Sequence, residues 1–122
     1  MLTIKKANEM KSFHYRDVKA EDAGHGSSKL SVRWLITNEM GAKNFAMRFF
    51  EMEPGGYSPF HSHDWEHEVF ILEGEGVVVA EGEERRFRGG DVIFIPANEK
   101  HHFKNTGKET VKFLCLIPYT ST

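Results

Sequence analysis

The stretch that decides the fold is residues 55–74, GGYSPFHSHDWEHEVFILEG. Three histidines, His61, His63 and His67, fall within seven residues, immediately before a run of apolar β-branched and aromatic residues typical of a strand. Side chains at positions i and i+2 of a strand point to one face, about 6.6 Å apart along it. His61 and His63 can therefore reach one metal ion, which binds imidazole nitrogen at about 2.1 Å.

His67 has the same parity, but on a straight strand it would lie about 20 Å from His61. We therefore expect residues 64–66 to form a turn, so that His67 opens the next strand. A further ligand has to come from a distant stretch, because adjacent residues leave one side of an ion open. His101 and His102 are the two candidates. The pattern predicts one divalent transition-metal ion per chain.

Outward from this stretch, the chain from Leu30 onward consists of short β-type runs separated by turn residues. The expected strands cover residues 31–37, 44–53, 58–63, 67–73, 77–80, 84–88, 91–95, 101–105 and 110–118. Such runs, with no amphipathic helix of three turns, predict an all-β antiparallel barrel or double-sheet jelly roll. We expect one barrel domain over 30–118, with 1–29 as an N-terminal arm of the same domain and 119–122 as a C-terminal tail.

Composition narrows the class of partner. The 122 residues carry 16 Lys and Arg against 18 Asp and Glu, a formal net charge of −2. Near-neutrality gives no electrostatic reason to expect nucleic acid or an anionic membrane as partner. No apolar run approaches the roughly 20 residues of a spanning helix, and the first residues lack the apolar core of a signal peptide. Cys115 is the single cysteine, so no internal disulfide is expected, and we predict a cytoplasmic protein.

Several expected strands are apolar on both faces. In the run 69–72, Val69 and Ile71 alternate with Phe70 and Leu72. One face can fill the barrel, while the other also has to leave water. Packing between two sheets of one chain is one explanation, and a dimer that covers one sheet is the other. We expect a homodimer, because a small barrel has few other layers to cover such faces.

The histidine stretch resembles the first motif of the cupin superfamily, G-x5-H-x-H-x3,4-E-x6-G. Residues 55–74 match it, with His61 and His63 in place and His67 where the family has glutamate. An alternative spacing would make Glu68 the ligand, but it leaves Glu68 one residue short of the motif and turns His67 to the opposite face. The arrangement is similar to that of small single-domain cupins with four-histidine metal sites.

Residues 90–105 resemble the second cupin motif, G-x5-P-x-G-x2-H-x3-N. The resemblance implies a double-stranded β-helix, the jelly-roll cupin barrel, with one metal ion near its centre. It also selects His101 rather than His102 as the ligand, and strand alternation agrees. Asn98 stands where the family has glycine. This is a mild change, since Asn tolerates positive φ better than most residues.

The resemblance thus implies the ligand set His61, His63, His67 and His101. Four neutral imidazoles leave the full charge on a divalent ion, which strengthens its Lewis acidity and disfavours a resting trivalent state. By resemblance we favour Mn or Fe, with Ni, Zn, Co and Cu as alternatives. A small apolar pocket is expected around the ion. The residues assigned to this interior are Phe45, Met47, Phe49, Val69, Ile71 and Phe103.

Three functions fit such a site. The first is a metal-dependent oxidoreductase of dioxygenase type, with a small substrate and dioxygen at adjacent open positions of the ion. The second is a non-redox isomerase, cyclase or lyase that uses the ion as a Lewis acid. The third is a non-catalytic module that binds a metabolite or a metal. Whether the protein is an enzyme is left open, and no residue is assigned as general acid or base, because the same fold hosts many chemistries.

Overall fold

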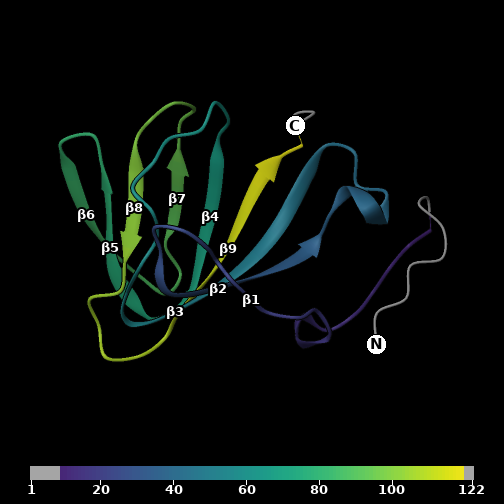
Figure 1. Ribbon diagram of the computed structural model, residues 1–122, viewed down its shortest axis with the longest axis horizontal. Helices are drawn as coiled ribbons and strands as arrows, with labels where there is room; N and C mark the ends of the chain where they lie inside the picture. The colour runs from purple at the N-terminus through teal and green to yellow at the C-terminus, as the bar shows by residue number, and fades with distance from the viewer. Residues whose placement is uncertain (1–8, 120–122) are drawn as a thin grey trace.

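In a computed structural model of the protein, described for residues 9–119, the chain is built from strands (Figure 1). They are β1 (Glu21–Asp22), β2 (Ser28–Ile36), β3 (Phe45–Tyr57), β4 (His67–Glu73), β5 (Glu75–Ala80), β6 (Glu83–Arg88), β7 (Val92–Ile95), β8 (His101–Lys104) and β9 (Val111–Pro118). Two short 3-10 turns, η1 (Tyr15–Asp17) and η2 (Asn38–Met40), complete the described elements. The all-β prediction is confirmed. Within the described part, no helix is long and apolar enough to cross a membrane.

All strand pairs are antiparallel, in the order β6-β5-β8-β3-β9-β4-β7, with β2 also paired to β3 and β1 to β2. β3 and β8 pair only at Tyr57 and Lys104. The sheet is therefore almost divided into a β6-β5-β8 part and a β2-β3-β9-β4-β7 part. The two parts pack against each other as the layers of a jelly roll.

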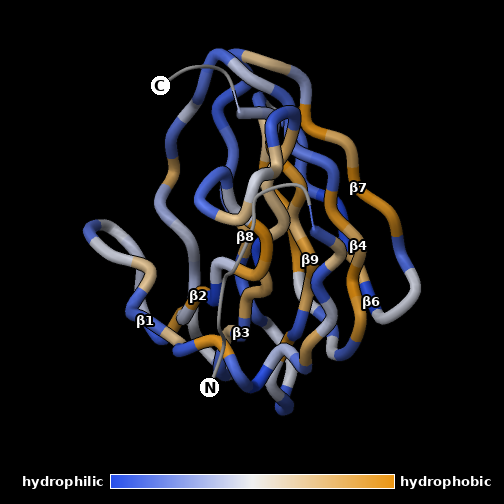
Figure 2. Tube along the Cα trace, turned by 90° about the vertical axis from the view of Figure 1, so that its right-hand side faces the viewer, coloured by the Kyte–Doolittle hydropathy of each residue, from blue (hydrophilic) through white to orange (hydrophobic). Residues whose placement is uncertain are grey.

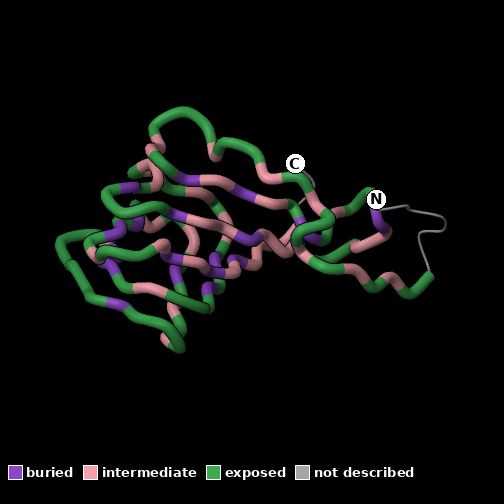
Figure 3. The backbone as a smooth tube through the Cα atoms, turned by 90° about the horizontal axis from the view of Figure 1, so that it is seen from below, coloured by how far each residue is buried: buried purple, intermediate pink, exposed green. Residues whose placement is uncertain are grey.

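Phenylalanine rings join the two parts. Phe87 of β6 contacts Phe103 of β8 at 6.0 Å between ring centroids, and Phe103 stacks on Phe113 of β9 at 5.2 Å. Phe50 of β3 stacks on Phe113 at 5.0 Å. Each buried ring contributes about 1.5–3 kcal/mol, so this row is a large share of the core. Figure 3 shows such buried positions interspersed with exposed ones along the strands.

The predicted interior is partly confirmed. Val69, Ile71 and Phe103 are 2%, 0% and 5% exposed, as assigned, and Cys115 is 3% exposed. They belong to one hydrophobic cluster that draws residues from eight strands, β2 to β9. The cluster consists of Leu30, Met52, Val69, Ile71, Val78, Phe87, Ile95, Phe103, Val111, Phe113 and Cys115.

The assignment of alternate β3 residues to the interior was wrong. Phe45 is 62% exposed, and Met47 and Phe49 share its side of the strand. The opposite parity faces the core, since Phe50 lies opposite the buried Phe113 in the β3–β9 register. Both faces of this run are apolar, so alternation alone does not say which face is buried.

The expected strand over residues 58–63 is also not formed. Only His61 takes part in β-type pairing there, through an isolated bridge to His101. Pro59 lacks a backbone N–H and cannot donate to a ladder, which explains why pairing is interrupted. The segment still runs beside β8, because Ser58 donates its N–H to the carbonyl oxygen of Phe103 at 2.9 Å.

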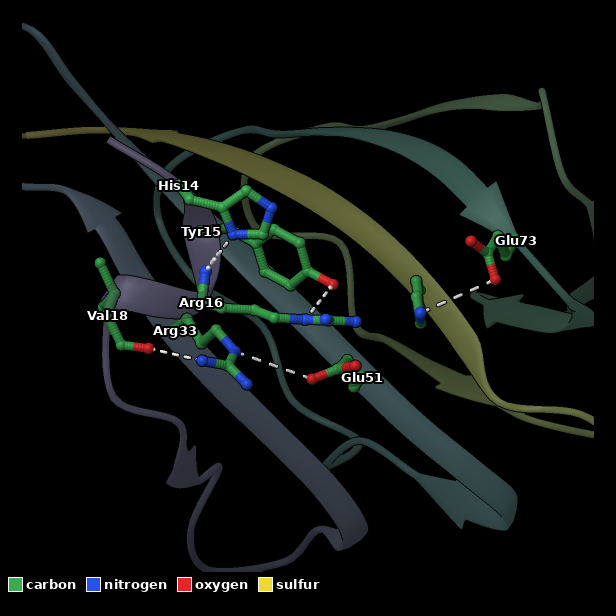
Figure 4. A network of polar contacts seen from close by, with 8 residues as sticks. His14, Tyr15, Arg16, Val18, Arg33, Glu51 and Glu73 are labelled. Atoms are coloured by element: carbon green, nitrogen blue, oxygen red, sulfur yellow. Dashed lines mark hydrogen bonds and ion pairs between the residues drawn. The ribbon is translucent and has the colours of Figure 1, made fainter. Parts of the chain in front are cut away.

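The N-terminal region covers part of the outer face (Figure 4). The Tyr15 ring stacks on Phe49 with ring centroids 4.5 Å apart. Arg33 donates to the carbonyl oxygen of Val18 at 2.6 Å and lies 3.7 Å from the Glu51 carboxylate. Phe49 is therefore buried from outside the barrel, by the region expected to be an arm.

The rest of that outer face stays open. Along β4 and β7, the apolar strip in Figure 2, and at the first residue of β3, large apolar side chains remain in contact with solvent. They are Phe45 at 62% exposure, Phe70 at 45%, Leu72 at 40%, Val92 at 73% and Phe94 at 55%. The prediction that these strands are apolar on both faces is confirmed, and the open face, defined here by these five residues, is called the outer apolar face.

Candidate metal centre

The first residues of β4 and β8 and one isolated β-bridge position three of the histidines. His67 is the first residue of β4, and His101 is the first residue of β8. His61 and His101 exchange backbone hydrogen bonds, with N–O distances of 3.2 and 3.0 Å. Residues 58–63 thus lie along β8 and bring the first histidine of the first motif to the histidine of the second.

A bend brings the remaining two histidines together. The chain bends at Asp64 and Trp65, so the predicted turn before His67 is confirmed. The backbone N–H of Asn98 donates to the carbonyl oxygen of His63, which ties the loop of the second motif to the first. Asn98 has a φ of 69°, the left-handed conformation for which glycine is usual and Asn is tolerated.

The four imidazole rings form a closed circuit. Centroid distances are 4.3 Å for His61–His63, 5.3 Å for His63–His67, 4.8 Å for His67–His101 and 5.8 Å for His61–His101. Rings that share one ion at an N–metal distance of about 2.1 Å have neighbouring centroids about 4.5–5.5 Å apart. The His63–His67 and His67–His101 distances lie in this range, and the other two lie within about 0.3 Å of it, so the ring spacing is close to that around a common ion.

The polar contacts of the buried rings fit as well. His67 and His101 are 6% and 5% exposed. The Nδ1 atom of His101 lies 2.8 Å from the carbonyl oxygen of Glu99, which can only accept, so this nitrogen carries the proton and Nε2 keeps its lone pair. The Nδ1 atom of His67 is buried with no hydrogen-bond partner. An orphaned buried nitrogen of this kind is expected at a ligand site.

All three histidines of the first stretch have lowered pKa values. Burial is the largest cause, and charge repulsion from neighbouring imidazoles follows. The pKa of His67 falls to about 3, that of His63 to about 4, and that of His61 is also below its usual value. These rings are neutral at pH 7, which is the form that binds a metal ion.

The imidazole nitrogens of the four histidines do not form a complete metal site. Among residues 9–119, no three His, Cys, Asp or Glu side chains are placed so that they could hold a metal ion as they stand. The donor type, the ring spacing and the neutral state fit a transition metal, whereas the nitrogen positions do not converge fully. The four histidines are therefore candidate ligands, and the metal itself is a proposal.

The two alternative ligands lie elsewhere. The His102 ring contacts Phe60 at 4.8 Å between centroids, on the opposite side of β8 from His101. Glu68 is exposed and lies opposite Leu116 on the outer side of β4. Neither side chain points to the circuit of rings.

Sequence reasoning missed two residues at this site. The Trp65 indole lies flat on the His63 ring, with centroids 4.4 Å apart and planes 8° apart. Arg48 of β3 lies close enough that its charge contributes to the lowered pKa values of His61, His63 and His67. One signal was available, since Arg48 is the only charged residue in the run FAMRFF at 45–50.

A cavity of about 450 Å³ opens between β5, β6 and β7, and none of the four histidines lines it. Its walls include Ala80 and Ile95, which lie opposite His101 and His67 in the strand register, and Glu99, the partner of His101. This size suits a small molecule. The cavity is less apolar than the expected pocket, because charged side chains also line it: Glu83, Arg85, Arg86 and Asp91.

Comparison with known proteins agrees with this architecture. The family model described as "Cupin domain" matches residues 48–117. The chain is 34% identical over 95 residues to an oxalate-binding protein of Thermotoga maritima, covering 75% of this chain and 78% of that one. It is 32% identical over 71 residues to 1-methylthio-D-xylulose 5-phosphate methylsulfurylase of Rhodospirillum rubrum, but spans 46% of that protein.

Among solved structures, the polyketide cyclase RemF from Streptomyces resistomycificus superposes with a TM-score of 0.84. It shares 38% sequence identity, and the match covers 90% of this chain and 80% of RemF. The family match spans more than half of the sequence and includes every candidate ligand. The two motifs, the curled antiparallel sheet and these matches establish that the chain belongs to the cupin family and has its jelly-roll fold.

Proposed function

We propose that the chain is a metal-dependent enzyme that acts on a small, oxygen-rich, enolisable substrate without a redox change. His61, His63, His67 and His101 would hold one divalent transition-metal ion, with Mn or Fe favoured over Ni, Zn, Co and Cu. The observation that supports this most directly is the circuit of four imidazole rings.

The bound ion would supply Lewis acidity, polarising a carbonyl or enol oxygen of the substrate and lowering its proton affinity. The protein would supply rigidity. The Glu99 carbonyl holds the His101 ring in one tautomer, and Trp65 restricts rotation of His63 by lying flat on it. Neutral ligands leave the ion its full charge, which favours Lewis-acid chemistry.

The relatives support a non-redox role. RemF, which matches 90% of this chain, is a polyketide cyclase, and the Thermotoga maritima relative is an oxalate-binding protein. Both names refer to ligands rich in carbonyl or carboxylate oxygen. They favour the cyclase alternative from the sequence over a dioxygenase, which stays an untested prediction.

Turnover with and without oxygen tests the proposal. The protein is stripped of metal, reloaded with Zn²⁺, Mn²⁺ or Fe²⁺, and incubated with a panel of poly-β-carbonyl compounds. We expect substrate conversion under anaerobic conditions and with redox-silent Zn²⁺. Oxygen uptake that matches substrate loss would instead establish the dioxygenase, and tight retention without conversion would establish a binding module. Failure to take up any of the three ions would refute the metal centre.

We also propose that a second copy of the chain covers the outer apolar face. Its five large side chains, about half exposed, present about 500 Å² of apolar surface, given 150–250 Å² for a large ring. A standard interface takes about 800 Å² from each partner, of which about 60% is apolar. The area therefore suits a homodimer. A cytoplasmic location and the lack of nucleic-acid or membrane partners stay predictions.

A further inference from the structure

Arg48 is a cation on the inner side of the barrel. In the strand register it lies between Trp34 of β2 and Cys115 of β9. Its guanidinium carbon lies 5.5 Å from the centroid of the Trp34 ring and 5.0 Å from that of Phe50. One terminal nitrogen donates to the Sγ atom of Cys115 at 3.0 Å. Two aromatic rings and a thiol therefore fix the orientation of the side chain.

Most of the hydrogen-bonding capacity of Arg48 is unused. A guanidinium has five N–H donors, and sulfur is a weak acceptor. The Nε atom of Arg48 is buried without a partner. Across residues 9–119, every salt bridge found joins other side chains: Arg33 with Glu51, Arg85 with Glu83, and Lys112 with Glu73. A cation held in this way lacks the acceptor that its planar fork is shaped to bind.

The surroundings offer Arg48 no internal counter-ion. The buried polar side chains of the described chain are His67, His101 and Asn105, none of which is a carboxylate. The inner side therefore carries positive charge before any metal ion is added, and an anion would relieve it.

The separation between Arg48 and the rings suits a small bridging molecule. Cys115 of β9 pairs with Arg48 on one side and with Val69 of β4 on the other. Arg48 and the strand that carries His67 are thus two strand spacings apart, about 10 Å between backbones. A terminal nitrogen of Arg48 reaches the Sγ atom of Cys115 on the middle strand, on the face of the sheet that also carries Val69 and His67.

We propose that Arg48 is the anion-binding residue of this site. Its guanidinium donates paired hydrogen bonds to the carboxylate or enolate oxygens of a small organic anion that also reaches the histidine centre. The contact of this anion with the histidine centre rests on the proposed function. The inference narrows the substrate class of that function to anions. Arg85, which lines the adjacent cavity, is a poorer candidate, because Glu83 already neutralises it at 2.7 Å.

Calorimetric titration of the metal-loaded protein tests this proposal. The probes are oxalate for carboxylates, acetylacetone above its pKa for enolates, and neutral oxamide as control. Replacing Arg48→Met, an apolar side chain that still fits between the rings, should weaken binding of an anionic probe about tenfold or more and leave oxamide binding unchanged. Arg48→Lys should restore part of the affinity, because it keeps the charge without the fork.

Arg88→Met is the matched control. It removes the same charge from an exposed position of β6, and anion affinity should stay unchanged. If Arg48→Met binds both anions as tightly as the unmodified protein, the proposal is overturned. If Arg48→Met and Arg88→Met weaken anion binding equally, net charge explains the effect and the proposal also fails.

Metal content separates an anion-binding role from a purely structural one. Removing a cation beside a divalent ion should leave metal affinity unchanged or raise it. Loss of stability and metal together, with unchanged anion affinity in the folded fraction, would show that Arg48 only packs. Should the unmodified protein bind no metal, the proposed function fails by itself. Arg48 is then tested in the metal-free protein, where oxalate should raise the Tm of the unmodified chain but not that of Arg48→Met.

Discussion

The two faces of strand β4 have similar composition but different environments. The side chains on the inner face are His67, Val69 and Ile71. The side chains on the outer face are Glu68, Phe70 and Leu72. Over residues 67–72, each face has one ionisable and two apolar residues, yet the inner three are at most 6% exposed, while Phe70 and Leu72 are 45% and 40% exposed.

The difference shows what gives each face its role. On the inner face, the ionisable residue contacts two further imidazoles and loses its charge. On the outer face, Glu68 keeps contact with water beside apolar neighbours that nothing in the described chain covers. Function is therefore expected where a polar residue interrupts a buried face, and association where an exposed face stays apolar. Paired substitutions along β4 test this contrast.

The largest expected effect is on metal affinity, at His67 and Glu68, the first two residues of β4. His67→Ala should lower metal affinity by about a hundredfold or more, because it removes a ligand and opens the buried side of the ring circuit. Glu68→Ala should retain about one metal ion per chain, as should His102→Ala. Elemental analysis of protein reloaded with Mn²⁺ measures this. Equal metal loss in His67→Ala and Glu68→Ala would break the contrast between the two faces.

A smaller effect is expected at the last pair. Ile71 is fully buried, so Ile71→Ala should lower the free energy of unfolding by about 2–5 kcal/mol. Leu72→Ala should cost less than about 1 kcal/mol in the monomer, since little of its contact area is internal. Urea unfolding followed by tryptophan fluorescence gives both values. Similar losses at the two positions would mean that the outer face is packed against something within the same chain.

The middle of the strand tests association. Phe70→Glu places a charge in the proposed dimer interface and should weaken dimerisation by about 2 kcal/mol or more, roughly thirtyfold in Kd. Met10→Glu, at a residue that is 92% exposed and is not one of the five residues of the outer apolar face, is the control. Light scattering across a dilution series reports the dimer fraction. A chain that is monomeric before any substitution would contradict the homodimer.

Much of this arrangement could be predicted from the sequence. The histidine spacing, with strand parity, pointed to His61, His63 and His67, and the resemblance to the second cupin motif selected His101. The structure brings these four rings together, and the strand His67–Glu73 was predicted with its observed bounds. Parity failed in β3, where Phe45 and Met47 were placed inside although the opposite parity faces the core. Where both faces of a strand are apolar, only the tertiary register decides which is buried.

Arg48 was missed for a related reason. A single charged residue in an apolar strand is usually placed on the exposed side, whereas here it points inward and stacks on Trp34 and Phe50. Its contact with Cys115 joins residues 67 positions apart in the chain. No local sequence pattern extends over 67 positions, so the inward orientation of Arg48 could be found only from the fold.

The smallest effect is a pH dependence that again separates the faces. In the metal-free protein, burial lowers the pKa of His67 to about 3, whereas in the unfolded chain a histidine titrates near its usual value of about 6.5. Below pH 6.5 the unfolded state therefore binds protons that the folded state does not. The folded state should therefore have its full stability above about pH 6.5. As the pH drops from there toward 3, His67 should lower the free energy of unfolding by up to about 1.4 kcal/mol per pH unit.

His67→Gln removes one titrating group and should reduce the pH dependence of Tm between pH 6.5 and 4.5 in the presence of a chelator, leaving the part due to His61 and His63. Leu72→Gln introduces the same amide on the outer face and should leave the slope unchanged. A slope that is unchanged by His67→Gln would mean that His67 is already solvated in the metal-free protein. In that case His67 would become buried only when a metal ion binds, and the contrast between the two faces would exist only in the metal-loaded protein.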